Sequence, residues 1–492
     1  MVHMSNDDLP KGWAWTTLGA IIKPSKEKVN PLEIKEIPYI SLEHIEKDTG
    51  RLLGRGNSSD VRSSKTKFNC GDLLYGKLRP YLNKVYISEF EGVCSTDLLV
   101  FPKNESFSSD FLFYRFLCRD FVSYASHNVS GVNLPRVNFQ TLSQFKIALP
   151  SLPEQHRIVA KIEELFTKLD AGINALHKVQ AQLKRYRQSV LKAAFEGKLT
   201  EAWRAEHLDE IEPASVLLAR ILKERRGKWE AEQLEKMKTK GTVPKDDKWK
   251  TKYKEPATPD TSELPGLPDD WTWVKLGQVT NLVTKGSSPR WQGFHYVNAG
   301  IVFLRSQNVG WGTLDLSNIA YLPEAFNEKE KKSILKEGDV LLNLVGASIG
   351  RVAIASNELV GANMNQAVAL IRLIKDGLDN KYLMRYFISP DAQSTIHGKK
   401  VDVARANLSL TDVSEFAVPL PPLLEQQAIV AEVESQLSVA DEVEKTITAE
   451  LKRAEQLRRS ILKKAFSGKL VPQDPNDEPA SVLLKRIKTE KA

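Results

Sequence analysis

The chain has 492 residues, of which 41% are hydrophobic, and it carries a formal net charge of +8 at pH 7. A chain of this length forms two or more domains with ample cores, and its positive charge favours a polyanionic partner such as nucleic acid. No apolar run approaches the roughly 18 residues of a membrane span, and the polar start lacks the apolar stretch of a signal peptide, so we expect a cytoplasmic protein.

The first predicted element is a strand near the start of the chain. It lies in the segment LPKGWAWTTLGAII at 9–22, and a related segment, LPDDWTWVKLGQVT, follows at 267–280. Each segment carries two tryptophans at alternate positions, Trp13 and Trp15 in the first, which is typical of a hydrophobic strand that opens a domain. Stacking of these indoles on nucleic-acid bases is the alternative interpretation.

Both halves continue with short β-prone runs and one helix. The predicted strands are 37–45, 71–75, 85–87 and 145–150 in the first half and 301–309, 338–342, 352–354 and 416–421 in the second; helices are expected at 109–123 and 379–389. Because these elements occur in the same order, the sequence predicts two α/β domains, residues 1–150 and 267–421. We expect mixed strands in them, without a regular βαβ alternation.

Each domain leads into one long helix, and these helices are the strictest part of the repeat. The segments 151–199 and 422–470 align at a constant offset of 271 positions without a gap. Apolar residues recur at steps of three and four, and about 43 residues at about 1.5 Å each make a rod of roughly 65 Å. Ser151 and Glu154 fit a capping box at the start of the first helix.

The apolar stripes predict that the two helices pack on each other as a coiled coil. The pair is expected to be antiparallel, because two halves that lie along one duplex are related by a dyad perpendicular to its axis. The residues expected in the helix–helix interface are Ile162, Leu169, Leu176, Leu183, Val433, Ala440, Ile447 and Leu451. The alternative is that each stripe docks on its own globular neighbour. The predicted class is α+β, with two α/β domains separated by long antiparallel helices and a pseudo-twofold internal repeat.

The segments that follow the helices, 200–266 and 471–492, are also partly repeated. PASVLL occurs at 213–218 and again at 479–484. In the first copy it opens a charged helix near 214–238, followed at 240–260 by a stretch rich in lysine, proline and threonine. We interpret that stretch as a solvated linker; contact of its lysines with phosphates is the alternative.

Motifs of known chemistry are missing from the sequence. There is no phosphate-binding GxxxxGK[ST], no Rossmann arrangement, no NPPY-like motif for amino methylation and no HExxH, which predicts a chain that is not itself an enzyme and binds no metal. The three cysteines, Cys70, Cys94 and Cys118, form no CxxC pair and are expected to be reduced core residues.

Basic and amide side chains are frequent in the predicted loops of both domains. Such side chains bond base edges or neutralise phosphates. The candidate DNA-binding residues are Arg51, Arg55, Lys65, Lys77, Arg79, Arg136 and Asn138 in the first domain and Lys285, Arg290, Arg305, Gln307, Arg351, Arg405 and Asn407 in the second. The loops 50–67 and 286–297 share almost nothing, whereas the helices match closely. Two copies of one scaffold are therefore expected to present two different reading surfaces.

The combined motifs resemble the specificity subunit of type I restriction-modification enzymes. They are PxxEQ opening a long helix, AFxGKL at the end of both long helices, a WRAE box at 203–206 and the duplication itself. The second copy lacks the WRAE box and has Val-Pro-Gln-Asp at 471–474, which leaves open what that tail contacts.

The resemblance implies a non-catalytic subunit with two target recognition domains, each reading one half of a bipartite, asymmetric DNA site. It also implies two modification subunits that carry S-adenosylmethionine and methylate adenine N6, and restriction subunits that cleave DNA with ATP and Mg. No cofactor is expected in this chain. Modification subunits would dock on the long helices, their tails and the AFxGKL ends. Two other classes remain as alternatives: a methyltransferase that acts alone, and a coiled-coil adaptor that binds only proteins.

Overall fold

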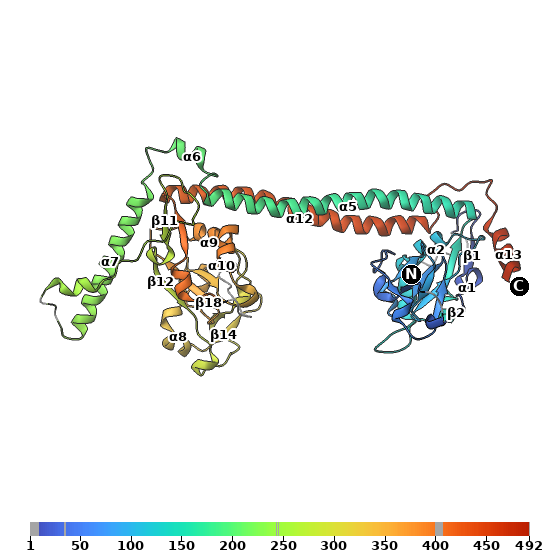
Figure 1. Cartoon of the computed structure of the whole chain (residues 1–492), viewed down its shortest axis with the longest axis horizontal. Coiled ribbons are helices and arrows are strands. Elements are labelled where there is room, and N and C mark those ends of the chain that lie inside the picture. The colour runs from blue at the N-terminus through green and yellow to red at the C-terminus, as the bar shows by residue number, and fades with distance from the viewer. Residues whose placement is uncertain (1–8, 34–35, 243, 245, 399–406, 492) are drawn as a thin grey trace. The chain divides into compact units, whose positions relative to one another are not determined.

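The computed structural model describes residues 9–33, 36–242, 244, 246–398 and 407–491. The chain divides into a first unit, Met1–Lys178 with Thr446–Ala492, and a second unit, Val179–Lys445. Each unit therefore contains one globular domain and parts of both long helices, α5 (Leu152–Phe195) and α12 (Leu423–Ala465), which Figure 1 shows in green and red. Within the described residues, no helix is long and apolar enough to span a bilayer.

Among its described residues, the first unit contains ten short strands and the helices around them. Its strands are β1 (Ala14–Thr17), β2 (Lys28–Val29), β3 (Pro38–Ile40), β4 (Gly56–Asn57), β5 (Lys65–Phe68), β6 (Leu73–Gly76), β7 (Val85–Ile87), β8 (Gly92–Cys94), β9 (Leu98–Phe101) and β10 (Lys146–Leu149). Its short helices are α1 (Leu18–Ile21), α2 (Ser109–Phe116), α3 (Arg119–His127), α4 (Phe139–Leu142) and α13 (Ala480–Lys491). The strands form sheets ordered β1-β10, β2-β5-β8-β3-β4 and β7-β6-β9.

The second unit repeats this plan with nine strands in the part of it that the structure describes. They are β11 (Thr272–Lys275), β12 (Thr280–Lys285), β13 (Ile301–Leu304), β14 (Ala320–Leu322), β15 (Val340–Asn343), β16 (Val352–Ile354), β17 (Asn363–Met364), β18 (Val368–Leu373) and β19 (Ala417–Leu420). The helices are α6 (Glu201–Glu206), α7 (Ala214–Thr239), α8 (Ala325–Lys329), α9 (Asn380–Ile388), α10 (Pro390–Gly398) and α11 (Leu410–Ser414). The sheets are ordered β11-β19, β12-β18-β15-β16 and β14-β13-β17.

Strand pairing confirms the internal duplication. The domain-opening strand β1 pairs antiparallel with the closing strand β10, and β11 pairs with β19 in the same way. In the middle of each unit, β6 lies antiparallel between β7 and β9, as β15 does between β16 and β18. One parallel pair, β3 with β8 or β13 with β17, completes each copy. The mixed sheets with few helices were predicted from the sequence.

The long helices run antiparallel within each unit. In the first unit, the start of α5 shares a core with the end of α12, where Ile158 and Ile162 are buried together with Ile461 and Ala465. In the second unit, the end of α5 shares a core with the start of α12. The stripes thus contact both the other helix and the globular domain, which combines the two interpretations that the sequence left open.

The predicted interface residues lie on the covered side of both helices. Ile162, Val433, Ala440 and Ile447 are buried, while Leu169, Leu176, Leu183 and Leu451 are half-buried. Polar contacts accompany them: Arg458 pairs with Asp170 in the first unit, and Arg187 pairs with Asp441 and Glu444 in the second. These positions agree with helix packing, and their contribution to it remains a prediction.

The structure differs from the sequence expectations at several local points. The expected strand 37–45 ends at Ile40, and 301–309 ends at Leu304, because a 3-10 turn begins at Leu42 in one and at Ser306 in the other. The helix expected at 109–123 is broken into α2 and α3. Cys94 and Cys118 are free and buried as expected, but Cys70 is exposed.

The repeated tails form matching helices that pack on the start of each domain. In α13, Leu483 and Ile487 are buried in the first unit's core, and Leu217 and Ile221 of α7 are buried in the second unit's core. The helix α7 is much longer, and the chain then returns so that Trp249 stacks on Trp229 at 6.1 Å. Part of the expected solvated linker is therefore an ordered turn, Asp247–Lys252.

Candidate nucleic-acid interface

Three strands of the second unit end beside the start of β18. Lys285 at the end of β12 pairs with Ala369, and Asn343 at the end of β15 pairs with Val368. The end of β13 reaches the same place, because the N–H of Asn365 donates to the carbonyl of Leu304 at 2.9 Å. Loops that leave this edge of the sheet therefore emerge close together.

Several predicted DNA-binding residues lie on these loops. The buried Asn343 donates through Nδ2 to the Ser306 carbonyl at 2.8 Å, and its N–H donates to the carbonyl of Arg351 at 2.8 Å. Asn407 forms a β-bridge with Val345, just beyond β15. The sheet edge brings together five of the predicted residues: Lys285, Arg305, Gln307, Arg351 and Asn407. We name this set the second basic edge.

The first unit has an equivalent edge beyond the end of β6. The N–H of Val137 donates to the carbonyl of Lys77 at 3.0 Å, and the N–H of Arg79 donates to the carbonyl of Pro135 at 2.7 Å. Leu78 forms a β-bridge with Arg136, matching the Val345–Asn407 bridge of the second unit. We name Lys77, Arg79 and Arg136 the first basic edge.

The charged groups of the two edges differ in how they are held. Arg136 is paired with Asp97 at 2.9 Å, and this hydrogen bond raises the pKa of its guanidinium. Arg79 is exposed and has a left-handed backbone with φ of 50°. In the second unit, Arg305 donates to the carbonyl and side chain of Asn318, whereas Gln307 is exposed.

Other predicted residues lie elsewhere or have structural roles. Lys65 is buried, with its ammonium at the Ser63 hydroxyl and over the Tyr39 ring, so the structure does not present it as a surface cation. Arg55 is exposed and lies over the ring of Phe90.

The remaining predicted residues divide between structural and exposed positions. Asn138 caps α4 by accepting from the Thr141 N–H at 2.8 Å. Arg51 and Arg290 are exposed, and Arg405 lies outside the described residues.

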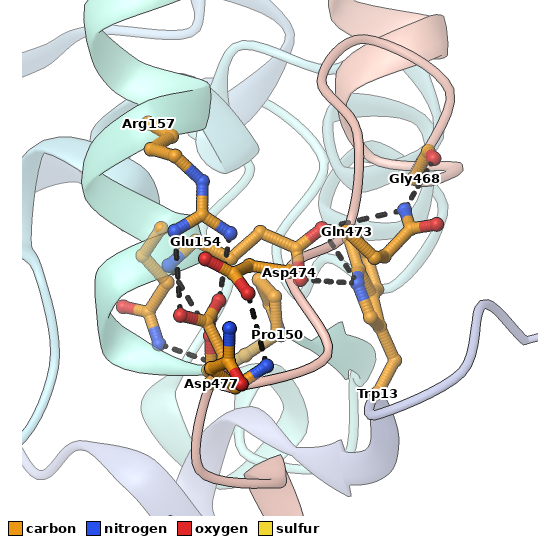
Figure 2. A network of polar contacts seen from close by, with 11 residues as sticks. Trp13, Pro150, Glu154, Arg157, Gly468, Gln473, Asp474 and Asp477 are labelled. Atoms are coloured by element: carbon orange, nitrogen blue, oxygen red, sulfur yellow. Dashed lines mark hydrogen bonds and ion pairs between the residues drawn. The ribbon is translucent and has the colours of Figure 1, made fainter.

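Each domain is fixed to its long helix by a clasp that the sequence analysis missed. In the first clasp, the indole N–H of Trp13 donates to both carboxylate oxygens of Glu154 at 3.0 Å (Figure 2). Gln473, from the tail after α12, donates to Glu154 at 3.4 Å and to the Gly468 carbonyl at 2.8 Å. The Glu154 N–H donates to the Ser151 hydroxyl oxygen at 3.2 Å, but the Glu154 carboxylate accepts from Trp13, so the predicted capping box is only half formed.

The same tail makes an ion pair on the neighbouring turn of α5. Asp477 accepts from Arg157 at 2.7 Å and from the Ser151 hydroxyl at 2.8 Å, as Figure 2 shows for the arginine. Hydrogen bonding to Arg157 lowers the pKa of Asp477. Burial raises the pKa of Glu154 above its ordinary value, against the opposing effect of the Trp13 and Gln473 hydrogen bonds.

The second clasp uses the WRAE box. The Trp271 indole donates to Glu425 at 2.8 Å, and Arg204 donates to the same carboxylate at 2.7 and 2.9 Å. Thr200 adds a hydrogen bond at 2.7 Å, and the Arg204 guanidinium lies 5.5 Å from the centre of the Trp271 ring. The WRAE arginine thus performs in the second unit what Gln473 performs in the first.

The glutamine of the repeated Glu-Gln pair completes each junction. Gln155 accepts from the N–H of Ser108, the residue that caps α2, and donates to the Pro150 carbonyl. Gln426 accepts from the N–H of Asp379, which caps α9, and donates to the Pro421 carbonyl. The sequence shows the tryptophan and the Glu-Gln pair in both copies. Their joint repetition is the signal that could have predicted a contact between the tryptophan and the glutamate.

The helix ends that were expected to dock modification subunits are largely covered within their own units. Phe195 is buried and contacts the rings of Tyr382 and Tyr386 at 5.2 and 5.1 Å. Phe195 is therefore not exposed for contact with another protein. Within the described residues, no group of three or more His, Cys, Asp or Glu side chains is placed to hold a metal ion.

Comparison with known proteins points to one family. A family model described as the type I restriction modification DNA specificity domain matches residues 10–181 and 268–453. The chain is 35% identical to the EcoDI specificity subunit of Escherichia coli, over 44% of this chain and only half of that protein. It is 27% identical to the EcoBI specificity subunit of Escherichia coli, over 86% of this chain and 80% of that one.

A solved structure shares the fold. Its description is the structural basis underlying complex assembly and conformational transition of the type I R-M system. It superposes with a TM-score of 0.69 at 20% identity, covering 94% of this chain and 99% of the other.

Proposed function

The chain belongs to the type I restriction modification DNA specificity family, and we propose that each of its basic edges reads one half of a bipartite, asymmetric DNA site. The proposal rests on one observation. The same strand topology brings basic side chains to the equivalent sheet edge in both units, joined by the amides Gln307 and Asn407 only in the second, so the two sets differ. Different donors on equivalent positions select different bases, so the two half-sites are expected to be unlike.

The chain itself supplies recognition, and partner subunits supply chemistry. We propose two modification subunits that carry S-adenosylmethionine and methylate adenine N6, and restriction subunits that use ATP and Mg to cleave DNA. The family supports this arrangement, as does the lack of catalytic motifs in the sequence. We further propose that the assembly acts in the cytoplasm, where chromosomal DNA is accessible to it.

The proposal is tested by expressing this chain together with its modification subunit in a methylation-deficient bacterial strain. Single-molecule sequencing then locates N6-methyladenine across the genome. We expect one bipartite motif with unlike halves and a fixed gap. A strain with the modification subunit alone is the control and is expected to lack the motif.

Two outcomes would contradict the proposal. Methylation at a single undivided motif would show that the two edges do not read separate half-sites. Absence of new methylation, in a strain where the modification subunit is present and active with another specificity subunit, would favour a protein-binding adaptor.

A further inference from the structure

One aromatic side chain of the second unit is exposed to an unusual degree. Of the nine tryptophans, only Trp291 and Trp311 are exposed, at 83% and 49%. Tryptophan is enriched at binding interfaces, because its large ring provides contact area and its N–H can find a partner there. Trp291 lies in a short 3-10 turn, Arg290–Gln292, on the loop that follows β12.

The loop around Trp291 is firmly anchored, so its exposure does not result from a loose chain. At its start, Gly286 lies so close to the backbone that an added Cβ would meet the Met364 carbonyl at 1.8 Å. After the turn, Phe294 packs on the rings of Phe303 and Phe326 in a small core.

The turn itself is also fixed by hydrogen bonds. Gln292 donates to Ser287 at 2.9 Å and accepts at its carbonyl from Lys329 at 3.1 Å. Gly293 ends the turn with a φ of 84°, a conformation that favours glycine. The indole of Trp291 is thus presented on a rigid support.

The loop is continuous with the second basic edge. It starts at Lys285, the last residue of β12 and a member of that edge. Arg290, immediately before the tryptophan, is exposed, and residues 285–300 contain no Asp or Glu. An exposed indole beside uncompensated cations matches a polyanion that also offers flat apolar surface, which is the chemistry of DNA bases and phosphates.

The sequence of the first unit has no tryptophan at the equivalent place. There the N–H of Ser25 donates to the Val100 carbonyl of β9, as the end of β12 bonds to β18. The following stretch, 26–37, contains no aromatic residue and three glutamates. The tryptophan is therefore an addition to the second unit, not part of the shared scaffold.

We propose that the Trp291 ring packs against bases in the half-site read by the second unit, while Arg290 neutralises a phosphate next to it. This inference rests on the proposed function, and it names a specificity-determining residue of that site. An aromatic contact adds affinity without adding charge, so its loss is separable from the loss of a phosphate contact.

The test uses the complex of this chain with its modification subunit and three duplexes: the full site found by sequencing, one with the second half replaced, and one with the first half replaced. Trp291→Ala is expected to lower affinity for the full site about 5- to 100-fold. Trp291→Phe is expected to restore part of it. The dependence of affinity on salt is expected to stay unchanged for Trp291→Ala and to become shallower for Arg290→Ala.

Trp249→Ala is the matched control, since it removes an indole from the returning turn after α7, far along the chain from the loop. On the duplex whose second half is replaced, Trp291→Ala and the wild type are expected to bind alike. Thermal unfolding is measured for both variants. The Trp291→Ala variant is expected to unfold at the same temperature as the wild type, because the Trp291 ring is mostly in solvent.

The outcomes separate the inference from the proposed function. A wild-type complex that binds all three duplexes alike overturns both. A wild type that discriminates, with a Trp291→Ala variant of equal affinity, overturns only the base contact. Release of the modification subunit from the Trp291→Ala complex in gel filtration would overturn it in favour of a protein contact.

Discussion

The two clasps contain equivalent tryptophan–glutamate pairs, but different donors surround the glutamate carboxylate in each. Glu154 in the first unit accepts from the neutral donors Trp13 and Gln473, whereas Glu425 in the second is paired with the Arg204 guanidinium. The position of the indole donor is shared, but the charge balance around the carboxylate is not. The junction therefore requires an acceptor for the indole N–H, and a cation beside it is optional.

The two basic edges differ in charge in the opposite sense: here the ion pair lies in the first unit and the neutral side chain in the second. The first has the ion pair of Arg136 with Asp97, and the second has the neutral Asn407 at the equivalent bridge. Backbone pairing at these positions is common to both units, so the fold does not depend on the side chains there. Side chains are free to diverge where the backbone alone defines the geometry.

Arg204→Ala tests the difference between the two clasps and is expected to have the largest effect on stability. Glu425 has a fully buried side chain, and removal of its arginine leaves a buried charge without a counter-ion. Loss of one partner of a buried ion pair costs about 3–5 kcal/mol of stability. The loss of stability is measured by urea unfolding, with hydrogen exchange reporting on the second unit. Gln473→Ala in the first clasp is the matched control, and equal losses in the two variants would show that the charge is irrelevant.

Arg79→Ala and Arg351→Ala test the difference between the edges. Each is expected to weaken binding to the full DNA site by about 1–3 kcal/mol, with relaxed selectivity only in its own half-site. Competition binding against duplexes with single base changes in either half provides the measurement. Lys236→Ala on the exposed surface of α7 is the control. Loss of selectivity in both halves from one substitution would contradict independent reading.

Glu154→Gln tests how the stability contributed by the first clasp depends on pH. Burial raises the pKa of Glu154 above 4.5, so the folded first unit binds a proton more tightly than the unfolded chain does. Its contribution to stability is therefore greatest below the unfolded pKa and is lost as pH rises through the folded pKa. The variant keeps an acceptor for Trp13 and is expected to cost about 1 kcal/mol or less at low pH, with the gap to wild type narrowing as pH rises.

Unfolding of the first unit between about pH 4 and pH 7 measures this change. Glu164→Gln is the control with the opposite sign. Lys161 and Lys168 lower the pKa of Glu164 to about 2, so its stabilisation is present above its unfolded pKa and is lost as pH falls through the folded one. A pH-independent gap between Glu154→Gln and wild type would show that the pKa of Glu154 is the same in the folded and unfolded states.

The smallest effects are expected between the long helices. Arg187→Ala removes ion pairs with Asp441 and Glu444, all partly exposed, and is expected to cost about 0.2–1 kcal/mol, less at high salt. Arg458→Ala also removes a contact 4.3 Å from the centre of the Phe166 ring, so it is expected to cost more. Helix content by circular dichroism and unfolding at two salt concentrations check both; an effect of Arg187→Ala that salt does not change would contradict the ion-pair explanation.

The long helices and the duplication could be predicted from the sequence because both depend on local, repeated patterns. The 3.6-residue period of apolar residues needs no knowledge of distant partners, and α5 and α12 begin and end within a few residues of the predicted limits. The strands were placed less well. Ser41 starts a 3-10 turn whose His44 ring accepts from the Ser41 N–H, and an alternating apolar pattern does not reveal such a turn.

The candidate site was only partly predictable, because charge in a loop does not say where the side chain lies. Lys65 was chosen as a surface cation, yet it is covered in β5. Arg305, Arg351 and Asn407 meet at one edge only through strand pairing between distant segments. The Trp13–Glu154 link joins residues 141 positions apart, and no local pattern connects them.

The tails that complete the clasps also determine how the elements follow one another. The N–H of Ala480 bonds to the Gly12 carbonyl, and that of Ala214 bonds to the Asp270 carbonyl. The second pair is joined covalently through the segment 214–270, whereas the first pair is held only by folding. The chain thus closes the second pair covalently and leaves the first pair open. A circular permutant opened within 246–260 instead would keep every clasp, and the entropy of loop closure would then stabilise the first unit in place of the second.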